Sequence, residues 1–361
     1  MTTDHSAWRR AGWAALGSGA LGAAAWWRGA LDNSGALGAL VTGTSIAGAG
    51  GWDWGAALVY FFVSSSALSR VASTRKRAVA ADKFAKGSQR DLGQALANAG
   101  VASALALARA TPWGARTRPA RWLRGAAAGA LATANADTWA TEIGTLSART
   151  PRLITSGRQV AAGTSGGVTP LGLAAALAGA GTLGAVFALA SRSVAVVNDG
   201  RTDSGMNSPS PTVYGPGRTP AIHGRERQAA IHGQAGAERD ARAVVGAALA
   251  GGIAGSLVDS LLGATAQAMF WCPRCQTETE RRVHRCGAST AFRRGWRWVD
   301  NDVVNAASTL AGALVGGVVT VILTESELRG AVLRTSRSKT KRIAETARAE
   351  GEQRQSAWRS N

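Results

Sequence analysis

The sequence AVVGAALAGGIAGSLVDSLLG, residues 243–263, carries a single charged side chain, Asp259. About 20 consecutive apolar residues suffice for a helix to cross the hydrocarbon core of a bilayer. Gly251, Gly255 and Gly263 recur at multiples of four residues, so they share one helical face and allow another helix backbone to approach closely. The stretch therefore predicts a transmembrane helix with a glycine-lined packing face.

Seven further apolar runs resemble this one, and several approach the same length. The run at 35–50 is shorter, which suits a re-entrant segment or half of a helical hairpin. Arg9 and Arg10 precede the first run as in a secretory leader, but more apolar runs follow, which favours a retained first helix. The expected fold is all-α, a multi-pass bundle of roughly six to eight transmembrane helices in the cell membrane. The runs lie at 11–30, 35–50, 52–69, 91–109, 122–140, 168–190 and 303–323, and the opening stretch extends to 270.

Two polar segments interrupt or follow these runs. Residues 191–242 are rich in Gly, Pro, Ser and Arg and contain nothing that could form a core, so we expect a disordered insert. Residues 325–361 form a basic tail. The expected organisation is membrane helices with motif loops over 1–190, the insert over 191–242, membrane helices with a Cys/His loop (271–302) over 243–324, and the tail.

The formal net charge of +19 would suit a nucleic-acid partner, but the basic residues lie mostly between apolar runs. That distribution is typical of loops that lie against anionic lipid headgroups. We therefore expect the lipid bilayer as a partner and no nucleic acid. Loops 70–90, 141–167 and 271–302 carry seventeen Lys and Arg residues, against four in 110–124, and are expected on the cytoplasmic side.

Carboxylates occur within or at the end of two apolar runs. The run ending at 140 contains Asn135 and Asp137 and leads into Glu142. A charged side chain inside a membrane helix is costly and marks function by default, and nearby carboxylates can hold Mg²⁺. Asp259 lies on the glycine face of its helix and is expected to face a polar cavity. The alternative is a hydrogen-bonded polar cluster that only packs helices.

Threading the eight runs as alternating crossings places five polar groups at one membrane face, as a single site requires. Asp91 and Asn98 are seven residues apart and share a helical face, although Asp91 could serve only as a helix N-cap. The candidate catalytic acids are Asp91, Asp137, Glu142 and Asp259, and the candidate phosphate- or substrate-binding residues at this face include Lys86, Arg90, Asn98, Asn135, Asn301 and Asp302.

The sequence GTSGGVTPLG, residues 163–172, is a glycine-rich loop before a helix start. Thr169 suits the N-cap and Pro170 the first helical position. Backbone N–H groups at such a start can bind a phosphate, but no Gly-Lys-Ser/Thr follows as in a Walker loop, and a plain tight turn is the alternative. The candidate phosphate cradle consists of Gly163, Thr164, Gly166, Gly167 and Thr169 with Arg152 and Arg158.

The three cysteines all fall in one short segment, which argues against a disulfide framework. Together with His284, the thiols of Cys272, Cys275 and Cys286 offer four ligands at a spacing that could close a tetrahedral Zn²⁺ site. A closed site of this kind is structural. Free thiols or redox chemistry are the alternatives.

Four motifs, in this order, resemble those of one membrane protein family. They are KGSQRD at 86–91 with QALAN at 94–98, ANADTWATEIG at 134–144, TSGGVT at 164–169 and DSLLGATAQ at 259–267. The family includes the plant chloroplast phytyl-phosphate kinase and the animal transmembrane protein 19, and this chain looks like a bacterial or archaeal-type member. The resemblance covers roughly 30–325 without the insert.

This resemblance implies transfer of a phosphoryl group from a nucleoside triphosphate, with CTP the expected donor, to an isoprenoid or other lipid phosphate. Such a phosphate has a second pKa of about 6, so it is its own anionic nucleophile near neutral pH. The residues agree, because acids for Mg²⁺ and arginines for phosphate are present without a central histidine. The alternative is a membrane transporter of a small or lipid-linked anionic solute, although no inverted repeat is evident.

Overall fold

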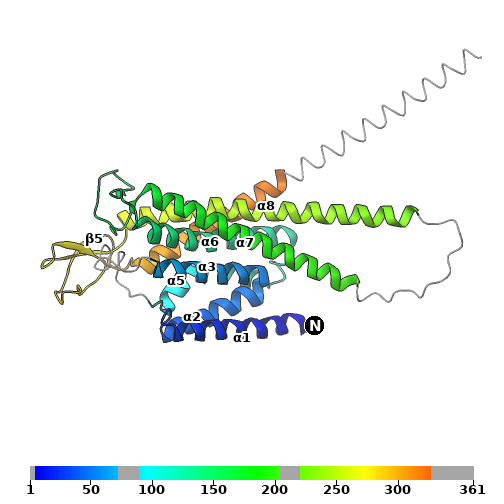
Figure 1. Ribbon diagram of the computed structural model, residues 1–361, viewed down its shortest axis with the longest axis horizontal. Coiled ribbons are helices and arrows are strands. Elements are labelled where there is room, and N and C mark those ends of the chain that lie inside the picture. Colours follow the sequence, from blue (N-terminus) through cyan, green and yellow to red (C-terminus); the bar gives the residue numbers. More distant parts are fainter. Residues whose placement is uncertain (1–4, 72–88, 204–219, 327–361) are drawn as a thin grey trace, which may run out of the picture. The chain divides into compact units, whose positions relative to one another are not determined.

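The computed structural model describes residues 5–71, 89–203 and 220–326 (Figure 1), and within these ranges every apolar run predicted above is a helix. The chain divides into two compact units, residues 1–320 and 321–361. The helices are α1 (His5–Trp27), α2 (Asn33–Gly43) continued by the π-helix η1 (Thr44–Gly50), α3 (Trp52–Arg70), α5 (Leu92–Arg109), α6 (Thr117–Gly144), α7 (Pro170–Asp203), α8 (Pro220–Thr265) and a final helix (Asn301–Ser326).

Three helical segments in the described part of the chain are long and apolar enough to cross a membrane by length and composition. They are Pro170–Val194, Glu238–Thr265 and Asn301–Ser326. The mostly helical, membrane-type fold is therefore confirmed. The count of six to eight membrane crossings stays a prediction.

The short second run forms one half of a tight helical hairpin. Asp32 caps α2 by accepting a hydrogen bond of 2.7 Å from the backbone of Gly35. The hairpin turns at Gly51, whose φ of 126° is a conformation that favours glycine, and α3 starts at the next residue. The turn at Gly51 agrees with the interpretation of residues 35–50 as one half of a helical hairpin.

Three helices meet at glycines near the middle of the bundle. A Cβ atom added to Gly251 of α8 would lie 2.7 Å from the Cα of Gly129 in α6 and 2.5 Å from the carbonyl oxygen of Gly312 in the final helix. Thr133, one turn after Gly129, donates a hydrogen bond of 3.1 Å to the carbonyl of Gly251. Only glycine allows three backbones to come this close, as the glycine-lined face predicted.

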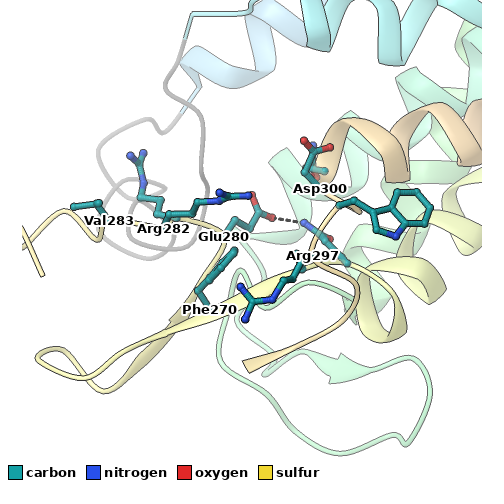
Figure 2. Close-up of a pocket in the computed structure, with 11 residues that line it drawn as sticks. Phe270, Glu280, Arg282, Val283, Arg297 and Asp300 are labelled. Carbon is teal, nitrogen blue, oxygen red and sulfur yellow. Dashed lines mark hydrogen bonds between the residues drawn. The ribbon is translucent and has the colours of Figure 1, made fainter. Parts of the chain in front are cut away.

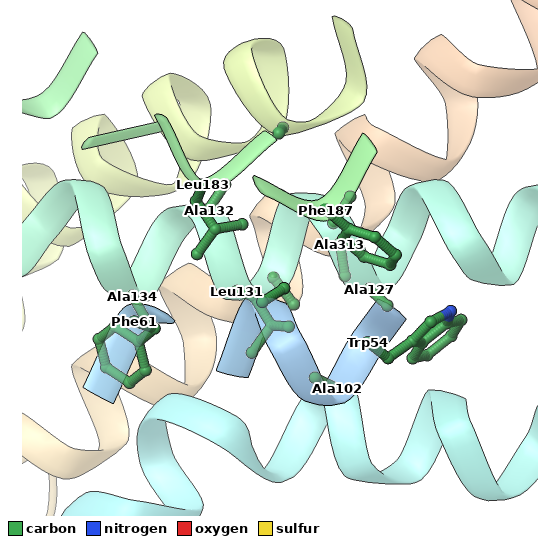
Figure 3. Packing of buried hydrophobic residues seen from close by; sticks show 14 of the residues in the cluster. Trp54, Phe61, Ala102, Ala127, Leu131, Ala132, Ala134, Leu183, Phe187 and Ala313 are labelled. Carbon is green, nitrogen blue, oxygen red and sulfur yellow. The ribbon is translucent and has the colours of Figure 1, made fainter. Parts of the chain in front are cut away.

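The core around this contact is built mainly of alanine, with a few large side chains. Leu131 of α6 and Leu183 of α7 are fully buried, and the rings of Trp54 and Phe187 meet edge to face at 6.1 Å between centroids (Figure 3). Small side chains on α6 let its neighbours pack against it from several sides. This makes α6 the central helix of the bundle.

An ion pair joins three helices at the end where α3 begins. Asp53 in the first turn of α3 accepts a hydrogen bond of 2.7 Å from Arg124 of α6 and one of 3.0 Å from Ser191 of α7. Asp53 is buried, so its charge is compensated by Arg124 rather than by water. Neither Asp53 nor Arg124 was predicted from the sequence to form an ion pair.

The insert is helical on both flanks rather than a disordered loop throughout. Helix α7 continues to Asp203 and α8 begins at Pro220, while residues 204–219 lie outside the described ranges. Extending an existing helix needs no new nucleation, and the Ala, Arg, Glu and Gln of 225–242 are good helix formers. The low hydrophobicity of the insert was therefore a poor guide to its backbone. Most of the basic tail, 327–361, also lies outside those ranges.

The loops at one end contain short strands that an all-α class does not include. Strand β1 (Arg152–Leu153) pairs with β2 (Gly167–Val168), antiparallel. In the Cys/His loop, β3 (Met269–Cys272) lies between β4 (Thr277–Thr279) and β5 (Ala291–Arg294) in an antiparallel sheet. The helical class holds for the bundle, and the Cys/His loop folds as a separate small β structure that we call the hairpin domain (residues 267–300).

The glycine contact gives a stability prediction. We expect Gly251→Ala to lower the free energy of unfolding by about 1–3 kcal/mol, because the new methyl group meets backbone atoms that cannot rotate away. Gly17→Ala is the matched control, since nothing lies within 4 Å of its added Cβ. Thermal unfolding in detergent measures both, and equal melting temperatures would contradict the close contact.

Candidate functional site

Two aspartates face each other where α6 and α8 touch. The carboxyl groups of Asp137 and Asp259 lie within hydrogen-bonding distance of each other. Ser308 of the final helix donates a hydrogen bond of 3.3 Å to Asp259 Oδ2. Each aspartate lies six or seven residues before the C-terminal end of its helix, about 10 Å along the axis. The structure thus brings two candidate acids from distant parts of the chain to one depth.

A second charged group forms where α3 and α6 end and α5 begins. Glu142 Oε1 accepts a hydrogen bond of 2.6 Å from Ser69, and its charge acts on Arg90. Burial lowers the pKa of Arg90, and the Glu142 carboxylate opposes this shift, so the guanidinium remains a cation. Arg90 also lies 5.8 Å from the ring centroids of Phe61 and Phe62. The result is a largely desolvated positive charge at the end of the bundle.

The backbone of Arg90 explains its fixed position. Its N–H donates to the carbonyl of Ala30 at 3.0 Å, and its own carbonyl accepts from Asp32 at 3.1 Å. The next residue, Asp91, caps α5 in a reciprocal capping box with Gln94. The structure therefore shows Asp91 as the N-cap of α5, the alternative to a role in the site. Lys86 lies outside the described residues.

Asn135 and Asn98 make hydrogen bonds within the bundle. The Asn135 side chain is fully buried, donates to the carbonyl of Gly179 in α7 at 2.7 Å and accepts from Ser64 in α3 at 2.9 Å. Asn98 donates to the carbonyl of Gln94 in its own helix at 2.9 Å. Asn135 thus ties α3, α6 and α7 together, a structural role that the sequence left open.

The glycine-rich loop packs against the end of α8. Gly163 and Gly166 have positive φ angles of 77° and 81°, and a Cβ on Gly166 would lie 2.6 Å from the backbone nitrogen of Ala264. As predicted, Thr169 caps α7, accepting a hydrogen bond of 3.0 Å from Gly172, and Pro170 is the first helical residue. The loop is therefore rigid and anchored to the helix that carries Asp259.

The arginines near this loop are exposed to solvent. Arg152 Nη1 donates to the carbonyl of Gly157 at 2.8 Å, and Arg158 lies in the same turn. Gly167 forms part of β2, and the N–H of Gly167 bonds to the carbonyl of Thr164 at 2.9 Å. Both guanidinium groups are thus available to an anionic ligand at the loop.

A hydrogen-bond chain links the loop to the hairpin domain. Ser165 donates a short hydrogen bond to the side-chain oxygen of Gln267, whose amide donates to Glu280 Oε1 at 2.8 Å. Glu280 also acts electrostatically on Asp259. Asn301 lines a cavity beside Gln267, and Asp302 lies in the first turn of the final helix. The loop, the acid pair and the hairpin domain therefore share one end of the bundle.

The four predicted zinc ligands converge. The sulfur atoms of Cys272, Cys275 and Cys286 and a ring nitrogen of His284 lie within 4.8 Å of one another. The sulfur atoms of Cys272 and Cys286 are 3.6 Å apart. Two sulfurs bound at about 2.3 Å to one tetrahedral Zn²⁺ would be separated by about 3.8 Å, so the donor set fits zinc.

Two backbone turns present these ligands. The N–H of Cys275 bonds to the sulfur of Cys272 at 3.4 Å, and Gln276 follows with a positive φ of 49°. The second turn has Gly287, with φ 82°, directly after Cys286. Hydrogen bonds from the backbone of Ala288 and from His284 lower the pKa of Cys286 to about 6, which favours the thiolate form that binds metal.

Sequence reasoning missed the polar partners that lie in otherwise ordinary positions. Ser69 and Ser308 each donate a hydrogen bond to a predicted acid, and Glu280 acts electrostatically on Asp259. A buried serine in an apolar helix is the one available signal for Ser308. The sequence contains no comparable signal for Glu280, because its interaction with Asp259 depends on how the hairpin domain packs against α8.

Comparison with known proteins identifies the family. The family described as "Integral membrane protein DUF92" matches residues 16–313. The chain belongs to this family. Protein PGR of Arabidopsis thaliana is 30% identical over 307 residues, covering 82% of this chain and 91% of the plant protein. These matches confirm the resemblance drawn from the motifs. No solved structure matches the chain.

The buried amide gives a prediction that separates structure from function. We expect Asn135→Ala to lower the melting temperature, because it removes the two hydrogen bonds that join α6 to Ser64 of α3 and to the Gly179 carbonyl of α7, at about 1–2 kcal/mol. Ser45→Ala should change little, since that hydroxyl bonds only to Val41 of its own helical segment. A stable Asn135→Ala protein with impaired turnover would instead assign Asn135 to the site.

Proposed function

We propose that this chain is an integral membrane phosphotransferase that moves the γ-phosphoryl group of a nucleoside triphosphate, with CTP the expected donor, onto an isoprenoid monophosphate. The observation that carries the proposal is the contact between the carboxyl group of Asp137 in α6 and that of Asp259 in the segment Glu238–Thr265, which is long and apolar enough to cross a membrane. The reaction class is supported by the resemblance of the four motifs to the family of the plant phytyl-phosphate kinase, and the chain's membership of the family of integral membrane proteins agrees with it.

The reaction asks for charge stabilisation more than for acid–base chemistry. An oxygen of the lipid monophosphate bonds to the γ-phosphorus while the bond from that phosphorus to the β–γ bridging oxygen breaks. The products are a prenyl diphosphate and a nucleoside diphosphate. Because the attacking oxygen is already anionic near neutral pH, no side chain needs to remove a proton.

The acid pair has the donor set that Mg²⁺ prefers. Two carboxylates at hydrogen-bonding distance repel each other unless a cation or a shared proton lies between them. Mg²⁺ usually binds one or two carboxylates together with phosphate oxygens and water, and when bound it neutralises charge on the transferred phosphoryl group. Asp137 and Asp259 would hold the ion, and the Ser308 hydroxyl orients Asp259.

Positive groups around the acid pair bind the phosphates in this proposal. Arg90 is partly buried beside Phe61 and Phe62, where a lowered dielectric strengthens its attraction for an anion, and the Glu142 carboxylate acts on its charge. Arg152 and Arg158, exposed beside the glycine-rich loop of residues 163–169, offer charge to the second phosphate, whereas the N–H groups of Thr164 and Gly167 already bond to the carbonyls of Ala161 and Thr164. The isoprenoid chain extends between helices or into lipid.

We also propose that Cys272, Cys275, His284 and Cys286 bind one structural Zn²⁺. The carrying observation is the convergence of all four ligand atoms in a domain with only short strands. So small a β structure has little apolar core of its own, and a metal would supply its folding energy.

The acid pair gives the central test. Asp137→Asn keeps the shape and removes the charge, so Mg²⁺-dependent turnover of CTP and a prenyl monophosphate should fall by about 10²–10³ while membrane insertion is unchanged. The Asp137→Asn/Asp259→Asn double variant should be about as slow as either single variant, because the two groups act on one ion.

The matched control is Asp240→Asn, an exposed aspartate on α8. It should retain wild-type turnover. If Asp137→Asn inserts normally and keeps full activity, the pair only packs helices and the proposed site is wrong.

The zinc proposal predicts about one Zn per chain by metal analysis of the purified protein. Cys272→Ser should lose the metal and lower the melting temperature. A strong chelator should lower the melting temperature of the wild type but leave that of the variant unchanged. Metal-free protein that melts normally would remove the proposal.

A further inference from the structure

A cavity opens between the hairpin domain and the start of the final helix. Its volume is about 480 Å³, and Figure 2 shows its walls. Small-molecule sites usually have volumes of roughly 300–1,000 Å³, so the cavity can hold a ligand of that class. The roles proposed above for the acid pair and the glycine-rich loop do not involve this cavity.

The lining combines positive charge, flat aromatic surface and acceptors. Arg282 and Arg297 contribute exposed guanidinium groups, and Phe270 and Trp298 contribute rings. Trp298 stacks on Trp296, with 5.8 Å between the ring centroids, and is still 68% exposed, so the rest of its ring surface is open to solvent at the cavity. Arginines recognise phosphates, and aromatic rings stack on nucleobases. This pairing of groups is the one that a nucleotide needs.

The cavity is connected to the acid pair. Glu280 in its wall accepts the hydrogen bond from Gln267 that Figure 2 marks with a dashed line, and Glu280 acts electrostatically on Asp259. Gln267, also in the wall, bonds to Ser165 of the glycine-rich loop. The wall of the cavity is therefore joined by hydrogen bonds to the glycine-rich loop, and one of its carboxylates acts on Asp259.

We infer that this cavity binds the nucleoside triphosphate, with the base on Trp298 and the phosphates on Arg282 and Arg297, directed toward the acid pair. The inference rests on the proposed phosphotransferase function and names its donor site. The hairpin domain is then a nucleotide-binding element, and its Cys/His cluster holds the wall formed by residues 280–283 in place.

An anionic bilayer surface is the competing ligand for these arginines. Basic loops of membrane proteins bind acidic headgroups, and such binding needs neither a concave site nor an aromatic wall. Here the arginines share the cavity with the carboxylates of Glu280 and Asp300, which would repel a sheet of phosphates. A single ligand with a polar base and a phosphate tail fits this mixed lining better.

The test measures binding without turnover. The full-length protein in detergent is titrated calorimetrically with cytidine 5′-(β,γ-methylene)triphosphate and Mg²⁺. The Arg282→Gln/Arg297→Gln variant should bind about 10- to 100-fold more weakly, because charge-assisted hydrogen bonds to phosphate are lost. Trp298→Ala should also weaken binding, and Trp298→Phe should restore part of it.

Arg285→Gln is the matched control, since it removes an exposed arginine of the same hairpin that does not line the cavity. It should bind within about twofold of the wild type, a difference well below the loss of one such hydrogen bond. Unchanged melting temperature in the double variant ensures that a loss of affinity reflects the site rather than unfolding.

Two results would overturn the inference. One is wild-type nucleotide affinity in the double variant. The other is unchanged nucleotide affinity with weaker adsorption to phosphatidylglycerol vesicles, which would assign the arginines to the membrane. Failure of the function itself looks different: the wild type would bind the analogue at the cavity yet phosphorylate no prenyl phosphate, and the nucleotide site would stand.

Discussion

The register between α6 and α8 determines where the chemistry of this protein can occur. Gly129 lies against Gly251, Thr133 lies against Gly255, and Asp137 lies against Asp259, so each successive pair is four residues further along both helices. The two helices therefore run parallel, and their contact face ends in an acid on each side. Lipid provides no hydrophobic drive for helix association, so small residues that permit backbone contact set this register.

The end of α8 organises the loops around that face. Arg294 of the hairpin domain donates to the carbonyls of Gly263 and Ala264 at 3.1 and 2.9 Å, which caps the helix C-terminus with a cation. Gly166 approaches the same turn from the other loop. Both loops thus take their position from one helix end. A change at α8 would displace the acid pair, the glycine-rich loop and the cavity together.

The sequence was sufficient to locate the helices of the bundle. In the described part of the chain a helix occurs at each predicted apolar run, and the spacing of Asp259 from its glycines placed it on a packing face. The sequence did not show that Asp137 is the partner of Asp259, because the register between two helices depends on the surfaces of both helices. The strands of the Cys/His loop were missed for a related reason: metal-ligand spacing constrains four side chains and leaves the backbone between them open.

Polarity alone does not show the structural role of two other features. The insert was interpreted as disordered because it cannot form a core, yet its flanks extend α7 and α8, for which neither nucleation nor a core is needed. Asn135 was grouped with the site because it adjoins Asp137, yet two residues along a helix point to nearly opposite faces. The position of each residue on the helix, more than its polarity, distinguishes Asn135, which joins α6 to α3 and α7, from Asp137, which meets Asp259 of α8.

The depth of the acid pair suits a reaction between a lipid and a water-soluble substrate. Asp137 and Asp259 lie about 10 Å inside their helix ends, a distance of about two helical turns. A lipid phosphate anchored by its chain can reach this level from the bilayer. A triphosphate must arrive from water, and the cavity of the hairpin domain opens at the same end of the bundle. In the proposed reaction the two substrates would therefore approach the acid pair from different phases, the lipid phosphate from the bilayer and the triphosphate from water through the cavity.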